Sequence, residues 1–234
     1  MIRNISVFIC LVACLLHTKS YAQPTLPEVG AISQEGINIL SWINPYSSGV
    51  KGLIIQRSRD SVVNFVTIGS MPAENNPIGT YIDAHPFPGA NYYLIKLVFT
   101  SGMEWKSNIV MLHVDSADLS NQKVLPPNDS LQKLIAQMGS SPSLDRLNAL
   151  SYTRSIFVYT NPYNGNINIE LPDVFKYKYH LTFFDDQNNE ALDIPRLNDP
   201  NIVLDKRNFQ RSGLYRFKLY KNNELMEEGY VTIY

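Results

Sequence analysis

The chain has 234 residues, of which 44% are hydrophobic and 18% charged, and its formal net charge is −1 at pH 7. This is ordinary globular composition, which excludes a disordered, collagen-like or supercharged protein. Without a basic excess, neither nucleic acid nor an anionic membrane surface is expected as the main partner. Tyrosine and proline, at 14 each, outnumber the 12 glycines, which favours short strands joined by turns.

The N-terminal residues have the three-part layout of a secretory signal. Arg3 supplies the positive charge, residues 5–16 form an apolar run, and small residues precede an expected cleavage between Ala22 and Gln23. The apolar run is too short to span a membrane. We therefore expect residues 1–22 to be removed and the protein to be exported. It would then lie in the periplasm, at the outer membrane, or at or beyond the cell surface.

Both cysteines, Cys10 and Cys14, lie inside this signal. The exported chain would then contain no thiol, which excludes thiol catalysis and cysteine-based metal sites. Leu11-Val12-Ala13-Cys14 resembles a lipoprotein cleavage box, which would acylate Cys14 instead. The apolar run continues past Cys14, so cleavage after Ala22 is the favoured interpretation and the lipoprotein is the alternative.

Short β-prone runs separated by turn residues fill the first block, which we place at residues 23–115. The runs are residues 37–42, 53–56, 65–68, 80–82, 92–99 and 108–114. About seven short strands at this spacing predict an immunoglobulin-like sandwich. Alternation should then direct Leu40 and Trp42 into the core and Ser41 outward. Tyr92 or Tyr93 is expected to form a tyrosine corner, with its hydroxyl on upstream backbone.

Residues 116–155 change character and predict a helical connector. Asn128-Asp129-Ser130 offers helix caps, and Gly139 offers a stop. Between them, apolar residues recur at i, i+3, i+4 and i+7: Leu131, Leu134, Ile135 and Met138. A second short stretch opens at Pro142-Ser143, with Leu144, Leu147 and Leu150 on one face. We expect these stripes to dock on a sandwich of the same chain, with a partner's groove as the alternative.

The last block, residues 156–234, is again rich in strand signals. Asn164-Gly165 predicts a hairpin between residues 156–159 and 167–169. Residues 179–184 predict a further strand, and residues 214–220 and 228–234 should pair across a turn. The predicted fold class is therefore mainly β, with two immunoglobulin-like or fibronectin III-like sandwiches joined by a short helical connector.

The first block resembles a fibronectin type III domain. The residues that carry the resemblance are 53–60 (LIIQRSRD), Asn64-Phe65, Ile68-Gly69, Tyr81-Ile82-Asp83 and 91–96 (NYYLIK). It is most similar to the type found in exported proteins of bacteria that use type IX secretion. The resemblance implies a β-sandwich over nearly all of the block.

The last block resembles the C-terminal sorting domain of type IX secretion. Asn161, Pro162, Asn164 and Gly165 match the family's opening motif, with Thr160 in place of its first proline. Gly213 and Tyr215 match its late glycine–tyrosine motif, and Gly229 falls in its terminal hairpin. Tyr230 and Tyr234 stand where the family usually has basic residues. The resemblance implies protein partners in the outer membrane or the secretion machinery, with only indirect membrane association.

Sequence motifs for catalysis are missing. His85, His113 and His180, the histidines beyond the signal, form no spaced metal-binding pair, and no nucleophile elbow, P-loop or dinucleotide fingerprint occurs. Asp185, Asp186, Asn188, Asn189 and Glu190 could offer oxygens to calcium. Such clusters also build hairpin turns, which is the favoured interpretation. We expect no enzyme activity, no cofactor and no metal.

The sequence thus predicts an exported, non-enzymatic binding or scaffold protein associated with type IX secretion. It would act either as cargo carrying its own sorting domain or as an accessory protein of the cell envelope. The alternative is a carbohydrate-binding or carbohydrate-active protein that stacks sugars on Tyr163, Tyr177 and Tyr179. Nucleic acid is not an expected partner, because Arg216 and Lys218 alternate with core residues along one strand.

Overall fold

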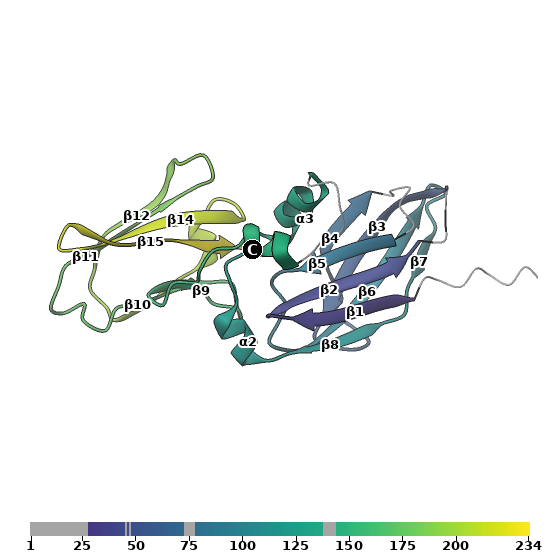
Figure 1. Ribbon diagram of the computed structural model, residues 1–234, viewed down its shortest axis with the longest axis horizontal. Coiled ribbons are helices and arrows are strands. Elements are labelled where there is room, and N and C mark those ends of the chain that lie inside the picture. The colour runs from purple at the N-terminus through teal and green to yellow at the C-terminus, as the bar shows by residue number, and fades with distance from the viewer. Residues whose placement is uncertain (1–27, 45, 47, 73–77, 138–143) are drawn as a thin grey trace, which may run out of the picture.

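The computed structural model describes residues 28–44, 46, 48–72, 78–137 and 144–234. In this part of the chain, antiparallel sheets form two β-sandwiches with short helices between them (Figure 1). The fold class predicted from the sequence is therefore confirmed. The expected signal, its cleavage site at Ala22 and Gln23, and the alternative lipid site at Cys14 lie outside the described residues.

The first sandwich has the strand order of immunoglobulin-like domains, to which fibronectin type III domains belong. One sheet runs β1-β2-β5, with β1 at Val29–Gln34, β2 at Ile37–Ile43 and β5 at Ile78–Asp83. The other runs β4-β3-β6-β7, and β8 also pairs with β6. Its strands are β3 (Val50–Ser58), β4 (Val66–Pro72), β6 (Gly89–Phe99), β7 (Glu104–Lys106) and β8 (Val110–Val114).

Alternation along β2 is as predicted. Leu40 and Trp42 are buried in the core of the first sandwich, whereas Ser41 is exposed. A Cβ on Gly79 of β5 would lie 2.2 Å from the Trp42 indole, so only glycine leaves room for that ring. The prediction from the sequence did not include β1 and β7, because these strands are short or polar and contribute few core residues.

The connector contains α2 (Ser116–Asn121), α3 (Asn128–Gln137) and α4 (Leu144–Ala149). Leu131 and Ile135 of α3 form a buried cluster with Leu147 of α4 and with Ile37 and Ile82. Ile37 and Ile82 point away from the core of the sandwich, so the helices cover the outer face of the β1-β2-β5 sheet. This confirms the prediction that the apolar stripes of the connector dock on a sandwich of the same chain. Met138, the expected stop at Gly139, and Pro142-Ser143 lie outside the described residues.

The second sandwich pairs a three-stranded with a four-stranded sheet. The smaller sheet runs β13-β10-β9, built from β9 (Val158–Thr160), β10 (Ile167–Glu170) and β13 (Asn201–Leu204). The larger runs β12-β11-β14-β15, built from β11 (Tyr179–Phe184), β12 (Glu190–Leu197), β14 (Gly213–Lys221) and β15 (Glu224–Ile233). A short 3-10 helix, η1 (Lys206–Asn208), precedes β14.

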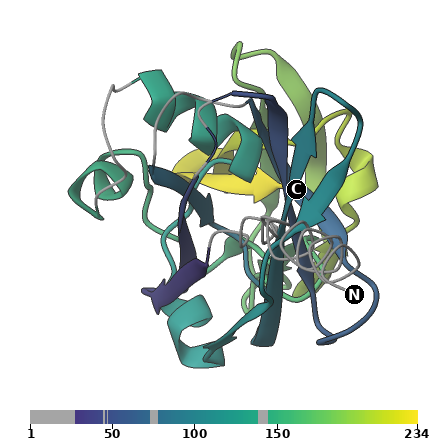
Figure 2. The ribbon, with the colours of Figure 1, turned by 90° about the vertical axis from the view of Figure 1, so that its right-hand side faces the viewer.

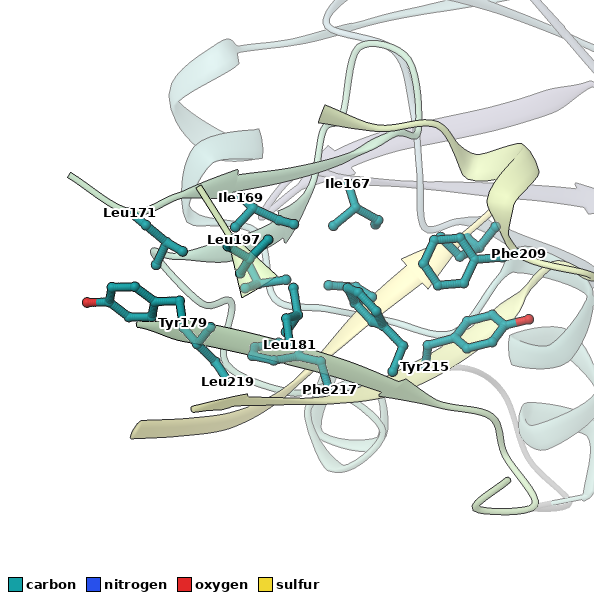
Figure 3. Close-up of a cluster of buried hydrophobic side chains, with 14 of the residues drawn as sticks. Ile167, Ile169, Leu171, Tyr179, Leu181, Leu197, Phe209, Tyr215, Phe217 and Leu219 are labelled. Carbon is teal, nitrogen blue, oxygen red and sulfur yellow. The ribbon is translucent and has the colours of Figure 1, made fainter. Parts of the chain in front are cut away.

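The side chains between these two sheets form a continuous hydrophobic core (Figure 3). Tyr215, Phe217 and Leu219 of β14 all point into it, as predicted, and each is at most 2% exposed. The predicted hairpin around Asn164-Gly165 joins β9 to β10. At the β14–β15 turn, Asn222 and Asn223 have φ values of 52° and 69°, a left-handed conformation that asparagine tolerates well.

The two sandwiches lie end to end, with the connector between them (Figure 1). A view turned by 90° shows β15 ending beside the connector helices (Figure 2). Among the described residues, no helix is long and apolar enough to cross a membrane.

Candidate functional site: the junction between the sandwiches

The last residues of β15 join the two sandwiches. The Thr232 hydroxyl donates to the carbonyl of Leu125 in the connector, over 2.6 Å. Two residues earlier, the ring of Tyr230 stacks on that of Tyr152, with centroids 3.9 Å apart. Tyr152 in turn exchanges backbone hydrogen bonds with Val124. Side chains of β15 therefore fix the connector to the second sandwich, and backbone hydrogen bonds hold two segments of the connector together.

A buried polar cluster lies inside the first sandwich at the end that faces this junction. Arg57 of β3 donates to a carboxylate oxygen of Asp83 on β5, over 2.5 Å. The same oxygen accepts from the Tyr93 hydroxyl of β6, over 2.8 Å. Asn38 of β2 donates to that hydroxyl, over 2.6 Å. The cluster therefore links four strands from both sheets across the end of the core.

Asn128, the first residue of α3, ties this cluster to the connector. Its amide nitrogen donates to the second oxygen of Asp83, over 3.1 Å, and its amide oxygen accepts from the backbone of Ala84, over 2.9 Å. The carboxylate of Asp83, which lies on one sheet, thus accepts hydrogen bonds from two strands of the other sheet and from the helix. The start of α3 is fixed by the same ion pair that closes the core.

Charge pairing in this cluster outweighs the cost of burial. Burial opposes ionisation of Asp83, but the Arg57 charge and the hydrogen bonds from Asn128, Tyr93 and Arg57 hold its pKa below the ordinary value. Burial also opposes the charge of Arg57, and Asp83 keeps the pKa of the guanidinium raised. Burial and the Asp83 charge raise the pKa of Tyr93. The pair is ionised and the phenol neutral at neutral pH.

The tyrosine corner expected at Tyr92 or Tyr93 in the first sandwich is wrong: among the described residues, the Tyr92 hydroxyl forms no hydrogen bond to upstream backbone. Tyr93 is buried, but its hydroxyl bonds to the side chains of Asp83 and Asn38 rather than to upstream backbone. The physical reason is that an ionised carboxylate within reach is a stronger acceptor than a carbonyl. In the second sandwich, the Tyr215 hydroxyl does donate to upstream backbone, at the Arg211 carbonyl over 2.8 Å.

His85 and Tyr234 cover the cluster from the junction side. Their rings stack with centroids 4.3 Å apart, and His85 Nε2 donates to the Pro126 carbonyl over 3.1 Å. Burial lowers the pKa of His85 to about 4 and raises the pKa of Tyr234 to about 12. The Arg57 guanidinium donates to the His85 carbonyl over 2.6 Å and lies 3.9 Å from the centroid of the Phe87 ring.

Two hollows flank these contacts. The walls of one come from both sandwiches and the connector, and the walls of the other come from the connector and the second sandwich. One of about 370 Å³ reaches the polar cluster, and its lining includes Arg57, His85, Asn128, Asp129, Ser212 and Tyr234. The other, of about 490 Å³, lies between α3 and the start of β14, and its lining includes Pro126, Lys133, Leu134, Arg211 and Leu214. The two hollows share Pro127, Ser130 and Ser212 as lining residues, so they are neighbouring parts of one crevice at the junction.

Apart from Asn38 Oδ1 and Arg57 Nε, which are buried without a hydrogen-bond partner, the side chains of the polar cluster hydrogen-bond to one another, an arrangement that holds domains together. Within the described residues, no three histidine, cysteine, aspartate or glutamate side chains gather in a way that could hold a metal ion. The geometry of the junction supports a role in fixing the two sandwiches relative to each other and in binding.

The residues that resemble the opening motif of a sorting domain form the turn between β9 and β10. The Asn161 side chain accepts from the Tyr163 backbone over 2.9 Å, and the Asn164 side chain accepts from the Asn166 backbone over 2.9 Å. Gly165 has a φ of 74°, which favours glycine. Pro162 lines a small pocket together with His85 and Tyr234. The structure thus brings this turn to the junction.

The other motif residues serve packing. Gly213 begins β14, and Tyr215 is 2% exposed in the core. A Cβ on Gly229 would lie 2.8 Å from the ring of Phe217, which is fully buried. Gly229 therefore provides the space for a core aromatic of the neighbouring strand. No chemistry of substrate binding is visible in these three positions.

The acidic cluster after β11 forms a hairpin turn. The Asp185 carboxylate accepts from the backbone of Gln187 and Asn189, over 2.9 and 2.8 Å. Arg211 forms ion pairs with Asp185 and Asp186. These bonds are those of a turn stabilised by its own side chains.

The tyrosines proposed to stack on sugars have different surroundings. Tyr179 is 1% exposed, so its assignment as a surface aromatic is wrong; its ring fills the second core. Tyr177 is 41% exposed, but the Lys221 ammonium lies 3.8 Å from the centroid of its ring. Tyr163 is 56% exposed, and its hydroxyl donates to Ser116 over 3.2 Å.

Sequence reasoning missed the residues that matter most at the junction, namely Arg57, Asp83, His85, Asn128 and Tyr234. One signal was present. Arg57 follows Leu53 and Ile55 at a spacing of two, and Asp83 likewise follows Tyr81. Alternation therefore places an arginine and an aspartate on inner faces, where charges persist only when paired. The contact of His85 with Tyr234 left no local signal.

No family model and no curated protein sequence matches the chain significantly. Among solved structures, pectate lyase Pel3 from Pectobacterium carotovorum matches with a TM-score of 0.33 and 17% identity, covering 36% of this chain and 26% of that chain. An Fn3-like protein from Clostridium thermocellum matches with a TM-score of 0.30 and 25% identity, covering 39% and 91%. The chicken CNTN1 FN1-FN3 domains match with a TM-score of 0.30 and 13% identity, covering 91% and 68%. This chain thus spans about a quarter of the length of Pel3. At these low TM-scores, the assignment of the fold rests on the strand order and pairing described above.

Proposed function

We propose that this protein is an exported, non-enzymatic scaffold whose two sandwiches bind protein partners of the cell envelope as one rigid body. The observation that carries the proposal is the junction, where the residues of β15 are bonded to the connector and the connector to a buried ion pair. A fixed relative position of two domains presents a composite surface, including the crevice between them. Preorganised surfaces bind with a smaller loss of conformational entropy.

Within type IX secretion, the packing of β15 favours an accessory protein over a secreted cargo. Tyr230, Thr232 and Tyr234 of the sorting-like domain contact Tyr152, Leu125 and His85. A sorting signal must be reached by the machinery that reads it. In this chain, the corresponding face of the strand is engaged by the connector and the first sandwich.

The test is localisation together with affinity capture from a bacterium that has type IX secretion. An affinity tag inserted after Gln23 leaves the packed end of β15 unchanged. We expect the full chain to be protected from protease in intact cells and to co-purify with outer-membrane components of the secretion machinery. Recovery at the cell surface would overturn the accessory assignment, and capture without any secretion component would overturn the association.

A junction variant shows whether partner binding needs the rigid body. Thr232→Val with Tyr152→Ala removes a hydrogen bond and a ring stack between the second sandwich and the connector. We expect lower recovery of the partner with both domains still folded by circular dichroism. Val203→Ser, at a residue of β13 that is 60% exposed, is the control and should bind as the wild type does.

A further inference from the structure

The hollow that reaches the polar cluster is lined by a guanidinium whose donors are only partly used. Arg57 lines this hollow, and its side chain is 8% exposed. Both hydrogen bonds of Arg57, to Asp83 and to the His85 carbonyl, start from Nη1. Among the described residues, Nη2 has no acceptor, and Nε is buried without one. Free donors on a buried guanidinium are costly unless a ligand or water accepts from them.

The start of α3 brings further free donors to the same hollow. The first backbone hydrogen bond of the helix runs from the Leu131 amide to the Pro127 carbonyl, over 2.9 Å. The amides of Asp129 and Ser130 precede that bond, and neither has an acceptor within the described part of the chain. Asp129 and Ser130 both line the hollow. Unpaired donors of the helix and of the guanidinium therefore belong to residues of one hollow.

The charges around the crevice favour a neutral ligand. The ionised groups that line it or lie behind its wall are Arg57, Lys133 and Arg211 against Asp83, Asp129, Asp185 and Asp186. With no excess of cations, a carboxylate or phosphate is not attracted. The exposed Asp129 carboxylate has no ion pair among the described residues, so it is a free acceptor. A carboxamide is neutral and offers both an acceptor and a donor.

The second hollow indicates that the carboxamide belongs to a peptide. Leu134 and Leu214, both half-buried, line this hollow, which continues the crevice away from Arg57. An extended peptide places different side chains in successive pockets of a groove. A sugar is the weaker match, because the aromatic rings of the crevice are already engaged. His85 stacks on Tyr234, and the other aromatic residue of the lining, on β14, is 2% exposed.

We propose that the crevice binds an extended peptide segment of a partner protein and takes the carboxamide of an asparagine or glutamine of that segment into the hollow at Arg57. The carboxamide oxygen accepts from the free donors of Arg57 and of the α3 terminus, and its nitrogen donates to Asp129. An apolar side chain of the same segment occupies the second hollow, against Leu134 and Leu214. This inference rests on the proposed scaffold function and names the chemistry by which the scaffold recognises its partner.

The test is selection of short random peptides, displayed on phage, with the purified full chain. We expect the enriched peptides to share asparagine or glutamine at one position beside an apolar residue. Replacing that carboxamide by the matching carboxylate should weaken binding roughly tenfold in fluorescence polarisation, because the carboxylate is repelled by Asp129 and cannot donate to it. The Nε–H resonance of Arg57 should also shift in the NMR spectrum when the enriched peptide is added.

Protein variants locate the binding to the crevice. Asp129→Ala removes the free acceptor and should weaken binding roughly tenfold. Asp118→Ala, at an exposed acid in the first turn of α2, is the matched control and should bind as the wild type does. Ser130→Trp fills the crevice where the two hollows meet and should abolish binding, whereas Val203→Trp on β13 should not.

The proposal is overturned if no peptide is enriched, or if the enriched peptides show acidic residues or no preference at the shared position. Equal binding by the wild type and Asp129→Ala would overturn it too. Because the probes are random peptides, these results do not depend on the identity of the envelope partner. Peptide binding in the crevice without capture of any secretion component would overturn the association with secretion and leave the chemistry of the crevice established.

Discussion

The imidazole of His85 lies nearly parallel to the phenol of Tyr234, with ring centroids 4.3 Å apart and an interplanar angle of 14°. His85 follows β5 of the first sandwich, and Tyr234 follows β15 of the second. The stack therefore joins residues far apart in the sequence. It also keeps the imidazole away from water and close to the Arg57 cation, which both favour the neutral ring.

The first prediction concerns pH. The pKa of His85 falls from an ordinary 6.5 to about 4 in the folded protein, so the unfolded chain binds more protons between these values. Stability is therefore complete above pH 6.5 and is lost as the pH falls toward 4, by at most about 3 kcal/mol. Urea unfolding of the wild type and His85→Gln at several pH values measures this, and the variant should lose less stability on acidification. His113→Gln, at an exposed histidine, should keep the pH dependence of the wild type. If the free energy of unfolding falls equally with pH in all three proteins, His85 is not the group responsible.

The second prediction concerns the buried ion pair. Asp83→Asn leaves the Arg57 charge buried without its counter-ion, and we expect a loss of about 3–5 kcal/mol in the free energy of unfolding. Replacing both residues, as Arg57→Met with Asp83→Leu, should recover part of that loss because no buried charge remains. Asp186→Asn, in an exposed pair with Arg211, should change stability by about 0.5 kcal/mol or less. If the double variant is less stable than Asp83→Asn, the two side chains stabilise the protein by more than the neutralisation of their charges, and the prediction is contradicted.

The third prediction concerns the connector. Leu131 of α3 is fully buried against the first sandwich, so Leu131→Ala should destabilise the protein by about 2–5 kcal/mol through a cavity. Leu134, half-buried at the crevice, is the matched control on the same helix. Leu134→Ala should cost clearly less in thermal unfolding. Equal losses would mean that α3 docks through its whole surface rather than through one stripe.

The fourth prediction separates two glycines of the sorting-like motifs. Gly229→Ala would place a Cβ 2.8 Å from the buried Phe217 ring, whereas at Gly213 the nearest atom, on the Tyr215 ring, lies at an ordinary 3.6 Å. We expect Gly229→Ala to lose about 1–3 kcal/mol in the free energy of unfolding through overpacking. Gly213→Ala should be close to neutral. If both variants are equally stable, the space beside Phe217 is larger than the contact distance indicates.

Much of the fold could be predicted because the signals were local. The alternation of Leu40, Ser41 and Trp42 and the Asn164-Gly165 turn each depend on neighbouring residues. The α3 stripe likewise lies within one helix. The strands that were missed, β1, β7, β12 and β13, carry little apolar alternation. Hydrogen bonds to a partner strand define these elements, and a partner strand is not a property of the local sequence.

The sequence by itself determined a chain of short strands in two blocks around an amphipathic helix, because periodicity and turn residues act over a few positions. Its composition then showed an ordinary, nearly neutral protein. Only the tertiary structure decided that Arg57, Asp83, Tyr93, Asn38 and Asn128 form one cluster, and that Tyr234 lies on His85. Each of those contacts joins residues from separate elements, and a buried charge is stable only where the whole fold brings its partners within hydrogen-bonding distance.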